Sequence, residues 1–153
     1  MSADATNASP ENGAWYSYAV IRVVPRVERE EFVNAGIILF ARTLQFLEAR
    51  IELDESKLRA IAPELDLALL RRHLETFLAV ADGRPEGGDV ASQGQSERFH
   101  WLTAPRSTMI QTSAVHVGFC EDPKAAVEDL MQRLVRGGGN KREEPDNSAD
   151  LSS

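Results

Sequence analysis

Apolar residues recur along the chain with two different spacings, and the first of these predicts strands. Residues 15–24 are rich in aromatic and β-branched side chains and end at Pro25. Residues 35–41 form a continuous apolar run, which is typical of a strand covered on both faces and predicts the centre of a sheet. Residues 45–53 alternate apolar and charged side chains. This alternation predicts a strand with one solvent-facing side, joined to the previous strand by a hairpin at residues 42–44.

The second spacing is helical and predicts three helices. Asp54 is expected to cap a short helix that ends at Pro63. The apolar positions of a longer helix follow: Leu67, Leu70, Leu74, Phe77, Leu78 and Ala81. The last helix is expected to start after Asp122, with Pro123 in its first position, and to end at Gly137. Residues 99–103 and 108–119 are rich in β-formers and predict two further strands around a turn.

This order of elements predicts an α+β fold. We expect a two-layer sandwich, with a mostly antiparallel sheet of about five strands and three helices packed on it. Residues 1–13 and 137–153 contain few large apolar side chains and are predicted to be a disordered leader and a disordered tail. Residues 14–136 are therefore expected to form a single domain. Within it, glycine-rich residues 82–97 predict a flexible loop.

Composition and charge restrict the class of protein. The chain has 153 residues, with 17 Lys and Arg against 24 Asp and Glu, and a net charge of −7. An acidic surface is unsuited to phosphate backbones, so nucleic acid is not an expected partner. No apolar run reaches the length of a membrane helix, no signal peptide is recognisable, and Cys120 is the single cysteine. We therefore expect a cytoplasmic protein that does not contact a membrane.

Three segments of the chain carry a resemblance to known proteins: SYAVIRVVPRVEREEFVNAGIILF at residues 17–40, ERFHWLTAPRSTMIQTSAVHVGFC at residues 97–120, and DPKAAVEDLMQRLV from Asp122. They are similar to a family of bacterial proteins, the DUF3037 family. The family is defined by sequence and has no established biochemical activity, so the resemblance implies no catalytic residues. Its members are often encoded beside HipA-like kinases, which implies a HipA-like kinase or another protein as partner.

Residues 98–120 contain no acidic side chain, although the chain as a whole is acid-rich. Guanidinium, hydroxyl and amide groups bind phosphate or carboxylate through charge-assisted hydrogen bonds. The candidate residues for such an anion site are Arg22, Arg106, Ser107, Thr108, Gln111, Thr112 and His116. A purely structural interpretation stays open, in which residues 105–107 form an ordinary turn and Arg22 pairs with Glu48 or Glu52.

Motifs for catalysis and cofactor binding are absent. The chain lacks a P-loop, a dinucleotide-binding glycine motif, a nucleophile elbow and a zinc-protease motif. His100, His116 and Cys120 are suitable zinc ligands, but His116 and Cys120 would lie roughly 13 Å apart along a strand, so we expect no metal site. We also expect no other cofactor. The sequence thus favours a non-catalytic binding or regulatory module acting through a protein partner. The alternative is a small enzyme or sensor acting on a phosphorylated or anionic ligand through an Arg/Thr/His cleft.

Overall fold

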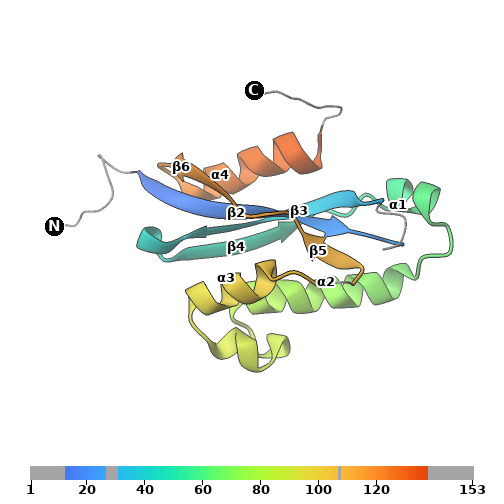
Figure 1. Ribbon diagram of the computed structural model, residues 1–153, viewed down its shortest axis with the longest axis horizontal. Helices are drawn as coiled ribbons and strands as arrows, with labels where there is room; N and C mark the ends of the chain where they lie inside the picture. The colour runs from blue at the N-terminus through green and yellow to red at the C-terminus, as the bar shows by residue number, and fades with distance from the viewer. Residues whose placement is uncertain (1–12, 27–30, 107, 138–153) are drawn as a thin grey trace.

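The computed structural model describes residues 13–26, 31–106 and 108–137, and within this part the strands form one antiparallel sheet (Figure 1). Its strands are β2 (Ala14–Val23), β3 (Val33–Ala41), β4 (Phe46–Ile51), β5 (Ile110–Thr112) and β6 (His116–Cys120). β3 lies between β2 and β4, while β5 and β6 both pair with the other edge of β2. The predicted α+β class and five-stranded sheet are confirmed. The predicted leader and tail lie outside the described residues, apart from Gly13 and Gly137.

β3 and its hairpin follow the expectation from sequence. All but one of the β3 residues are buried, as a strand covered on both faces requires. The turn into β4 is the short helical segment η2 (Arg42–Leu44), and it closes at Gln45, whose φ of 51° is left-handed. The Gln45 N–H donates to the Arg42 carbonyl, which fixes the hairpin.

The three predicted helices are present, and each begins at an aspartate. They are α1 (Glu55–Ile61), α2 (Leu67–Asp82) and α4 (Pro123–Leu130). The carboxylates of Asp54, Asp66 and Asp122 accept hydrogen bonds from backbone N–H groups in the first turns. Those N–H groups have no partner inside the helix, so the caps locate the helix starts. α4 continues as a wider turn, η5 (Met131–Val135), and Gly137 donates to the Gln132 carbonyl at its end.

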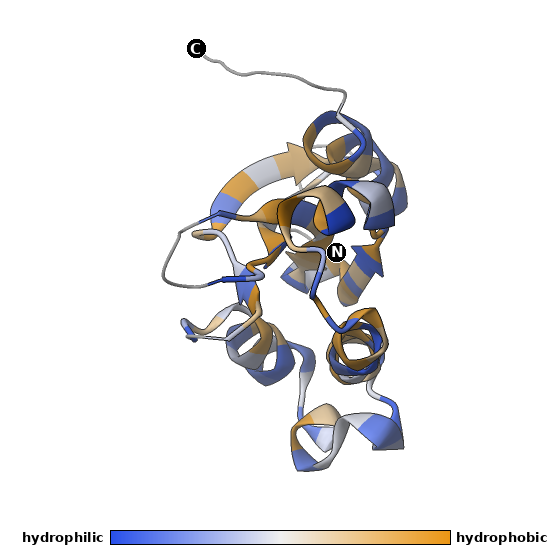
Figure 2. Cartoon of the chain, turned by 90° about the vertical axis from the view of Figure 1, so that its right-hand side faces the viewer, coloured by the Kyte–Doolittle hydropathy of each residue, from blue (hydrophilic) through white to orange (hydrophobic). Residues whose placement is uncertain are grey.

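Helices cover both faces of the sheet, so the fold has three layers rather than the predicted two (Figures 1 and 2). α1 and α2 pack on one face, here called the α2 face, and α4 with η5 packs on the other, the α4 face. The reason lies in β3, where Ile38 and Phe40 face α2 while Ile37 and Leu39 face α4. A strand that is apolar on both faces needs cover on both.

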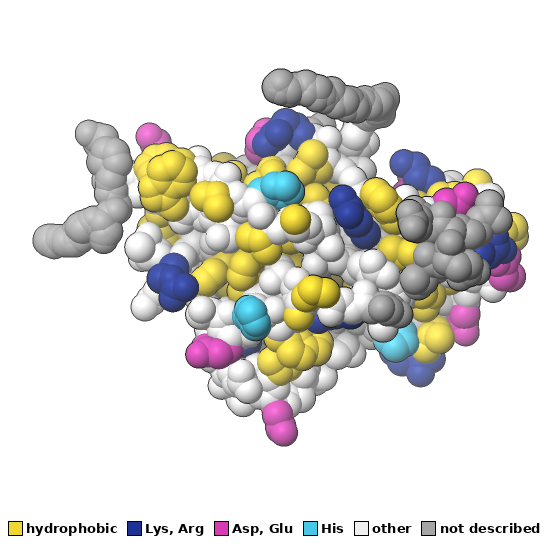
Figure 3. Space-filling view, viewed as in Figure 1, with side chains coloured by type: hydrophobic (Ala, Val, Ile, Leu, Met, Phe, Trp, Pro, Cys, Tyr) yellow, Lys and Arg dark blue, Asp and Glu magenta, His cyan; other side chains and the backbone are white. Residues whose placement is uncertain are grey.

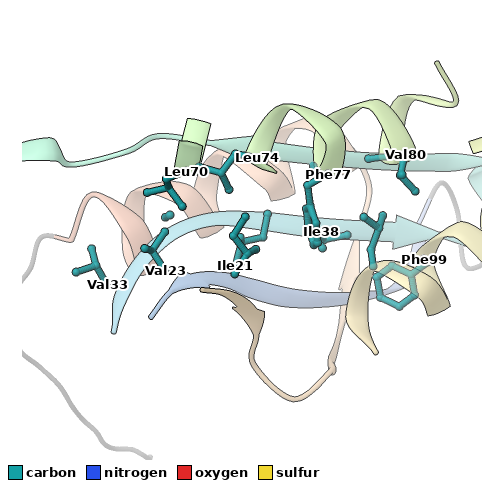
Figure 4. Packing of buried hydrophobic residues seen from close by; sticks show 14 of the residues in the cluster. Ile21, Val23, Val33, Ile38, Leu70, Leu74, Phe77, Val80 and Phe99 are labelled. Atoms are coloured by element: carbon teal, nitrogen blue, oxygen red, sulfur yellow. The ribbon is translucent and has the colours of Figure 1, made fainter. Parts of the chain in front are cut away.

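The larger core lies on the α2 face (Figure 4). Leu70, Leu74, Phe77 and Val80 project from α2 at helical spacing toward the sheet. They meet side chains of β2 and β3, among them Ile21, which is fully buried. This packing fixes the position of α2 against the sheet.

The prediction of a strand at residues 99–103 is wrong, because these residues belong to the helix α3 (Gln95–Thr103). Phe99 and Leu102, three residues apart, are both buried, and this spacing places them on one side of a helix. The predicted loop at residues 82–97 contains two helical turns, η3 (Pro85–Gly87) and η4 (Asp89–Ser92), before α3 starts. Tertiary packing here outweighs the local preference of β-forming residues.

The predicted strand at residues 108–119 is divided into β5 and β6 by residues 113–115. At this break, Ser113 forms the two hydrogen bonds to Val20 of β2 that a paired strand residue would otherwise form. Its N–H donates to the Val20 carbonyl, and its Oγ accepts from the Val20 N–H. Both β5 and β6 therefore stay on the same edge of β2.

Candidate functional site

The sheet separates the residues of the predicted anion site into two groups. Ile110 of β5 packs in the core on the α2 face, and the Thr112 hydroxyl reaches the Thr103 carbonyl of α3 on that same face. Arg22 and Gln111 are paired across β2 and β5, and by alternation they point to the α4 face. His116 also lies on that side, where its ring centre is 5.4 Å from that of Tyr18. The six candidate residues that the structure describes therefore do not converge in one pocket, and the seventh, Ser107, lies outside the described residues.

Arg106 lies in a hollow of about 390 Å³ between α2, α3 and β5, which we call the Arg106 pocket. Its guanidinium carbon is 4.8 Å from the ring centre of Trp101 and 5.5 Å from that of Phe77. One of its nitrogens donates to the Trp101 carbonyl at 2.5 Å, near the end of α3. Burial lowers the pKa of Arg106, and no carboxylate within the described residues pairs with it. The pocket lining includes Thr108 and His73 but no acidic side chain.

The polar side chains of the turn before β5 are engaged by the backbone. The Thr108 hydroxyl, in the lining of the Arg106 pocket, donates to the Ile110 carbonyl, and from the other face of β5 the Gln111 amide donates to the Thr108 carbonyl, both at 2.9 Å. A bound anion needs hydrogen-bond donors, and these two donors stabilise the turn before β5. Arg106 is therefore the main group that the pocket offers to an anion.

Arg22 does not form the predicted ion pair with Glu48 or Glu52. Glu48 pairs with Arg50, and Glu52 pairs with Arg136. These carboxylates lie at β4, and β3 separates β4 from the strand that carries Arg22. The Arg22 guanidinium instead stacks on Phe32, with its carbon 4.2 Å from the ring centre, and its buried Nε has no hydrogen-bond partner among the described residues. Burial lowers the pKa of Arg22.

An exposed apolar surface lies at the edge of the sheet, where the sequence predicted only a strand. It consists of Trp15, Val115, Val117 and Phe119, here called the β6 surface. Trp15 and Val117 are 68% and 67% exposed, and the Trp15 and Phe119 rings pack edge to face at 5.1 Å. Figure 3 shows hydrophobic side chains gathered over this end of β2 and β6. In the sequence, this surface could have been anticipated from the alternation of Val115, Val117 and Phe119 in a segment that has no Lys, Arg, Asp or Glu.

A hollow of about 510 Å³, here called the β6 hollow, adjoins this surface between β6, η2 and α3. Phe40 and Phe99 line it together with Arg42 and His100, and no Asp or Glu does. Arg42 stacks on Phe40 and makes one long hydrogen bond, 3.5 Å, to the Ser96 hydroxyl. The hollow thus combines apolar and hydroxyl side chains with a local positive charge.

Comparison with known proteins places the chain in a family. The model of the family described as "Protein of unknown function (DUF3037)" matches residues 18–135. The chain belongs to the DUF3037 family. The resemblance seen in the sequence is therefore confirmed. No curated protein and no solved structure matches the chain.

The DUF3037 match covers Arg22, Arg106 and β6, whereas Trp15 precedes it. The family description names no activity, so any site in this DUF3037 protein has to be argued from its geometry. Among the helices described, none is long and apolar enough to cross a membrane. Likewise, no three His, Cys, Asp or Glu side chains of the described residues gather closely enough to hold a metal ion. His100 lies on α3, and His116 and Cys120 lie at opposite ends of β6.

Proposed function

We propose that this DUF3037 protein is a cytoplasmic, non-catalytic binding module that acts through a protein partner, which it contacts with the β6 surface. The observation that carries the proposal is the exposure of Trp15 and Val117 side by side at the edge of the sheet. Contiguous exposed apolar side chains are typical of interaction sites, and tryptophan contributes strongly to protein interfaces. The separation of Arg22 from Arg106 supports a binding role over a catalytic one, since catalysis requires convergent groups.

The first partner to test is the HipA-like kinase that the family resemblance implies. Val117→Lys places a charge in the β6 surface, and Ala60→Lys places the same charge on an exposed position of α1. We expect the wild type and Ala60→Lys to bind the kinase equally in calorimetry, and Val117→Lys to bind at least about tenfold more weakly. Equal binding by both variants would exclude the β6 surface as the contact. Turnover of a phosphoester by the protein alone would favour an enzyme instead.

The Arg106 pocket supports a second candidate function, a sensor or enzyme for a phosphorylated or anionic ligand. The specific observation is a half-buried guanidinium, stacked on two aromatic rings and without a carboxylate partner in the described part of the chain. Calorimetry with inorganic phosphate and common nucleotides tests it. Arg106→Ala should weaken binding by roughly 1.5–3 kcal/mol, and Arg106→Lys should fail to restore a bidentate contact. Equal affinities for the three proteins would contradict this candidate.

A further inference from the structure

We propose that the partner segment at the β6 surface binds as an extended strand along the free edge of β6 and directs a carboxylate into the β6 hollow, toward Arg42. The proposal rests on the proposed function and specifies the chemistry of the partner. Three features of the described residues support it: the free edge of β6, the apolar side chains beside that edge, and the positive charge in the hollow.

The edge of β6 lacks the protection found at the opposite edge of the sheet. One side of β6 pairs with β2, and no described strand pairs with its other side. The opposite edge strand, β4, carries Glu48 and Arg50, which form ion pairs with Lys124 and Glu128 of α4. Charged side chains on an edge strand discourage pairing with another chain. β6 has no Lys, Arg, Asp or Glu, so its backbone is open to strand addition.

The side chains beside this edge suit a strand with an apolar face. Val117 and Phe119 alternate in β6, which places them on the same face, Val115 precedes the strand and lines the same hollow as Val117, and Trp15 packs against Phe119. A strand added next to β6 would place every second side chain on that face, within contact of its cross-strand neighbours. The partner segment should therefore alternate, with apolar residues at every second position except the one that carries the carboxylate, because the β6 hollow lies on the same face as Val117.

The charge of the hollow selects an acidic segment. Arg42 has no carboxylate partner within the described residues. Its one hydrogen bond there, to the Ser96 hydroxyl, has a donor–acceptor distance of 3.5 Å and is therefore weak. His100 contributes a second side chain with a ring N–H, and no acidic residue lines the hollow. A carboxylate from the partner would supply the missing counter-charge and form a charge-assisted hydrogen bond. This local charge contrasts with the net charge of −7 for the whole chain.

Selection from a phage library of random peptides of about twelve residues, long enough for one strand, tests the proposal with the full chain. We expect enriched peptides to alternate apolar and polar residues, to carry Asp or Glu, and to be lost when Val117→Lys replaces the wild type as bait. Ala60→Lys should retain them. A selected peptide is then synthesised and titrated by tryptophan fluorescence, together with copies that carry an N-methyl group on a central amide or Gln in place of the acidic residue.

The N-methyl copy should bind at least about tenfold more weakly, because strand addition needs the peptide N–H groups. Arg42→Gln should weaken the acidic peptide and leave the Gln peptide unchanged, with circular dichroism as the check on folding. The proposal is overturned if N-methylation has no effect, if enriched peptides are basic or have helical periodicity, or if no peptide is enriched. It is also overturned if the chain sediments as a dimer that Val117→Lys dissociates, since a second copy then occupies the edge. Kinase binding that remains sensitive to Val117→Lys would leave the proposed function intact in each case.

Discussion

At the scale of single residues, Ser113 bridges a gap in the hydrogen bonding of the sheet. Val20 pairs with Ile37 of β3 on one side, but on its other side it lies between the part of β2 that pairs with β5 and the part that pairs with β6, where no strand residue is opposite it. The Ser113 Oγ accepts the Val20 N–H at 2.9 Å and itself donates to the Ala114 carbonyl. A buried side chain thus supplies a hydrogen bond that the ladder lacks, and β2 keeps its partners on both sides of the break.

We therefore expect Ser113→Ala to lower the free energy of unfolding by about 1–3 kcal/mol, because the buried Val20 N–H would lose its partner. Ser92→Ala is the matched control, since Ser92 is exposed and its hydroxyl donates to the Asp89 carbonyl. The control should change the free energy by no more than about 0.5 kcal/mol. Urea unfolding measures both, and equal losses in the two variants would show that Ser113 is not needed at the break.

At the scale of elements, Arg136 ties the end of the C-terminal helical segment to the sheet. Its Nε and Nη2 donate to the two carboxylate oxygens of Glu52 at 2.8 and 2.7 Å, directly after β4. Its Nη1 donates to Glu128 of α4 at 2.5 Å. The hydrogen bonds from Arg136 lower the pKa of both carboxyl groups, Glu52 and Glu128.

A carboxyl whose pKa is lowered by folding stabilises the protein above its unfolded pKa of about 4.3, and this stabilisation is lost as the pH falls through the lower, folded pKa. The melting temperature of the wild type should therefore fall more steeply below about pH 4.5 than that of Arg136→Gln. Arg72→Gln removes the same charge from an exposed position of α2 and should keep the wild-type slope. Thermal melts from pH 3 to 7 at low salt test this, and parallel curves for the wild type and Arg136→Gln would contradict it.

At the scale of the whole molecule, the two cores share the same strands. β2 and β3 each contribute side chains to the core on the α2 face and to the smaller core on the α4 face. Loss of packing on one face must therefore affect the strands that the other face needs. We expect the described domain to unfold as one cooperative unit.

Leu130→Ala tests this coupling, because Leu130 is fully buried in the core on the α4 face. The cavity should lower the free energy of unfolding by about 2–5 kcal/mol. Trp15 and Trp101 lie on the side of the sheet away from α4, so their fluorescence reports on the other layer. Fluorescence and circular dichroism should shift together in urea. A circular dichroism transition that precedes the fluorescence transition would show that the α4 layer unfolds by itself.

The sequence by itself determined the features that depend on neighbouring residues. Asp54 and Asp122 located the starts of α1 and α4, because a cap bonds to N–H groups only two or three positions further along the chain. The apolar run at residues 35–41 located the doubly covered strand, because its composition alone requires cover on both faces. The family was also recognisable from the sequence, and the match at residues 18–135 confirms it.

Tertiary structure decided the features that depend on distant residues. Residues 99–103 favour a strand locally, yet they form a helix because Phe99 and Leu102 pack together against the sheet. Arg22 and Arg106 lie on opposite faces of the sheet: Arg22 alternates in β2 with the core residues Ile21 and Val23, whereas Arg106 follows α3 and lies against aromatic rings of α2 and α3. Trp15 is an ordinary strand residue in the sequence, and it is exposed because no described element covers the edge formed by β6. Whether a side chain is exposed, and which side chains meet in one site, depends on strand pairing and packing between segments that are far apart in the sequence. Local sequence patterns do not contain this information.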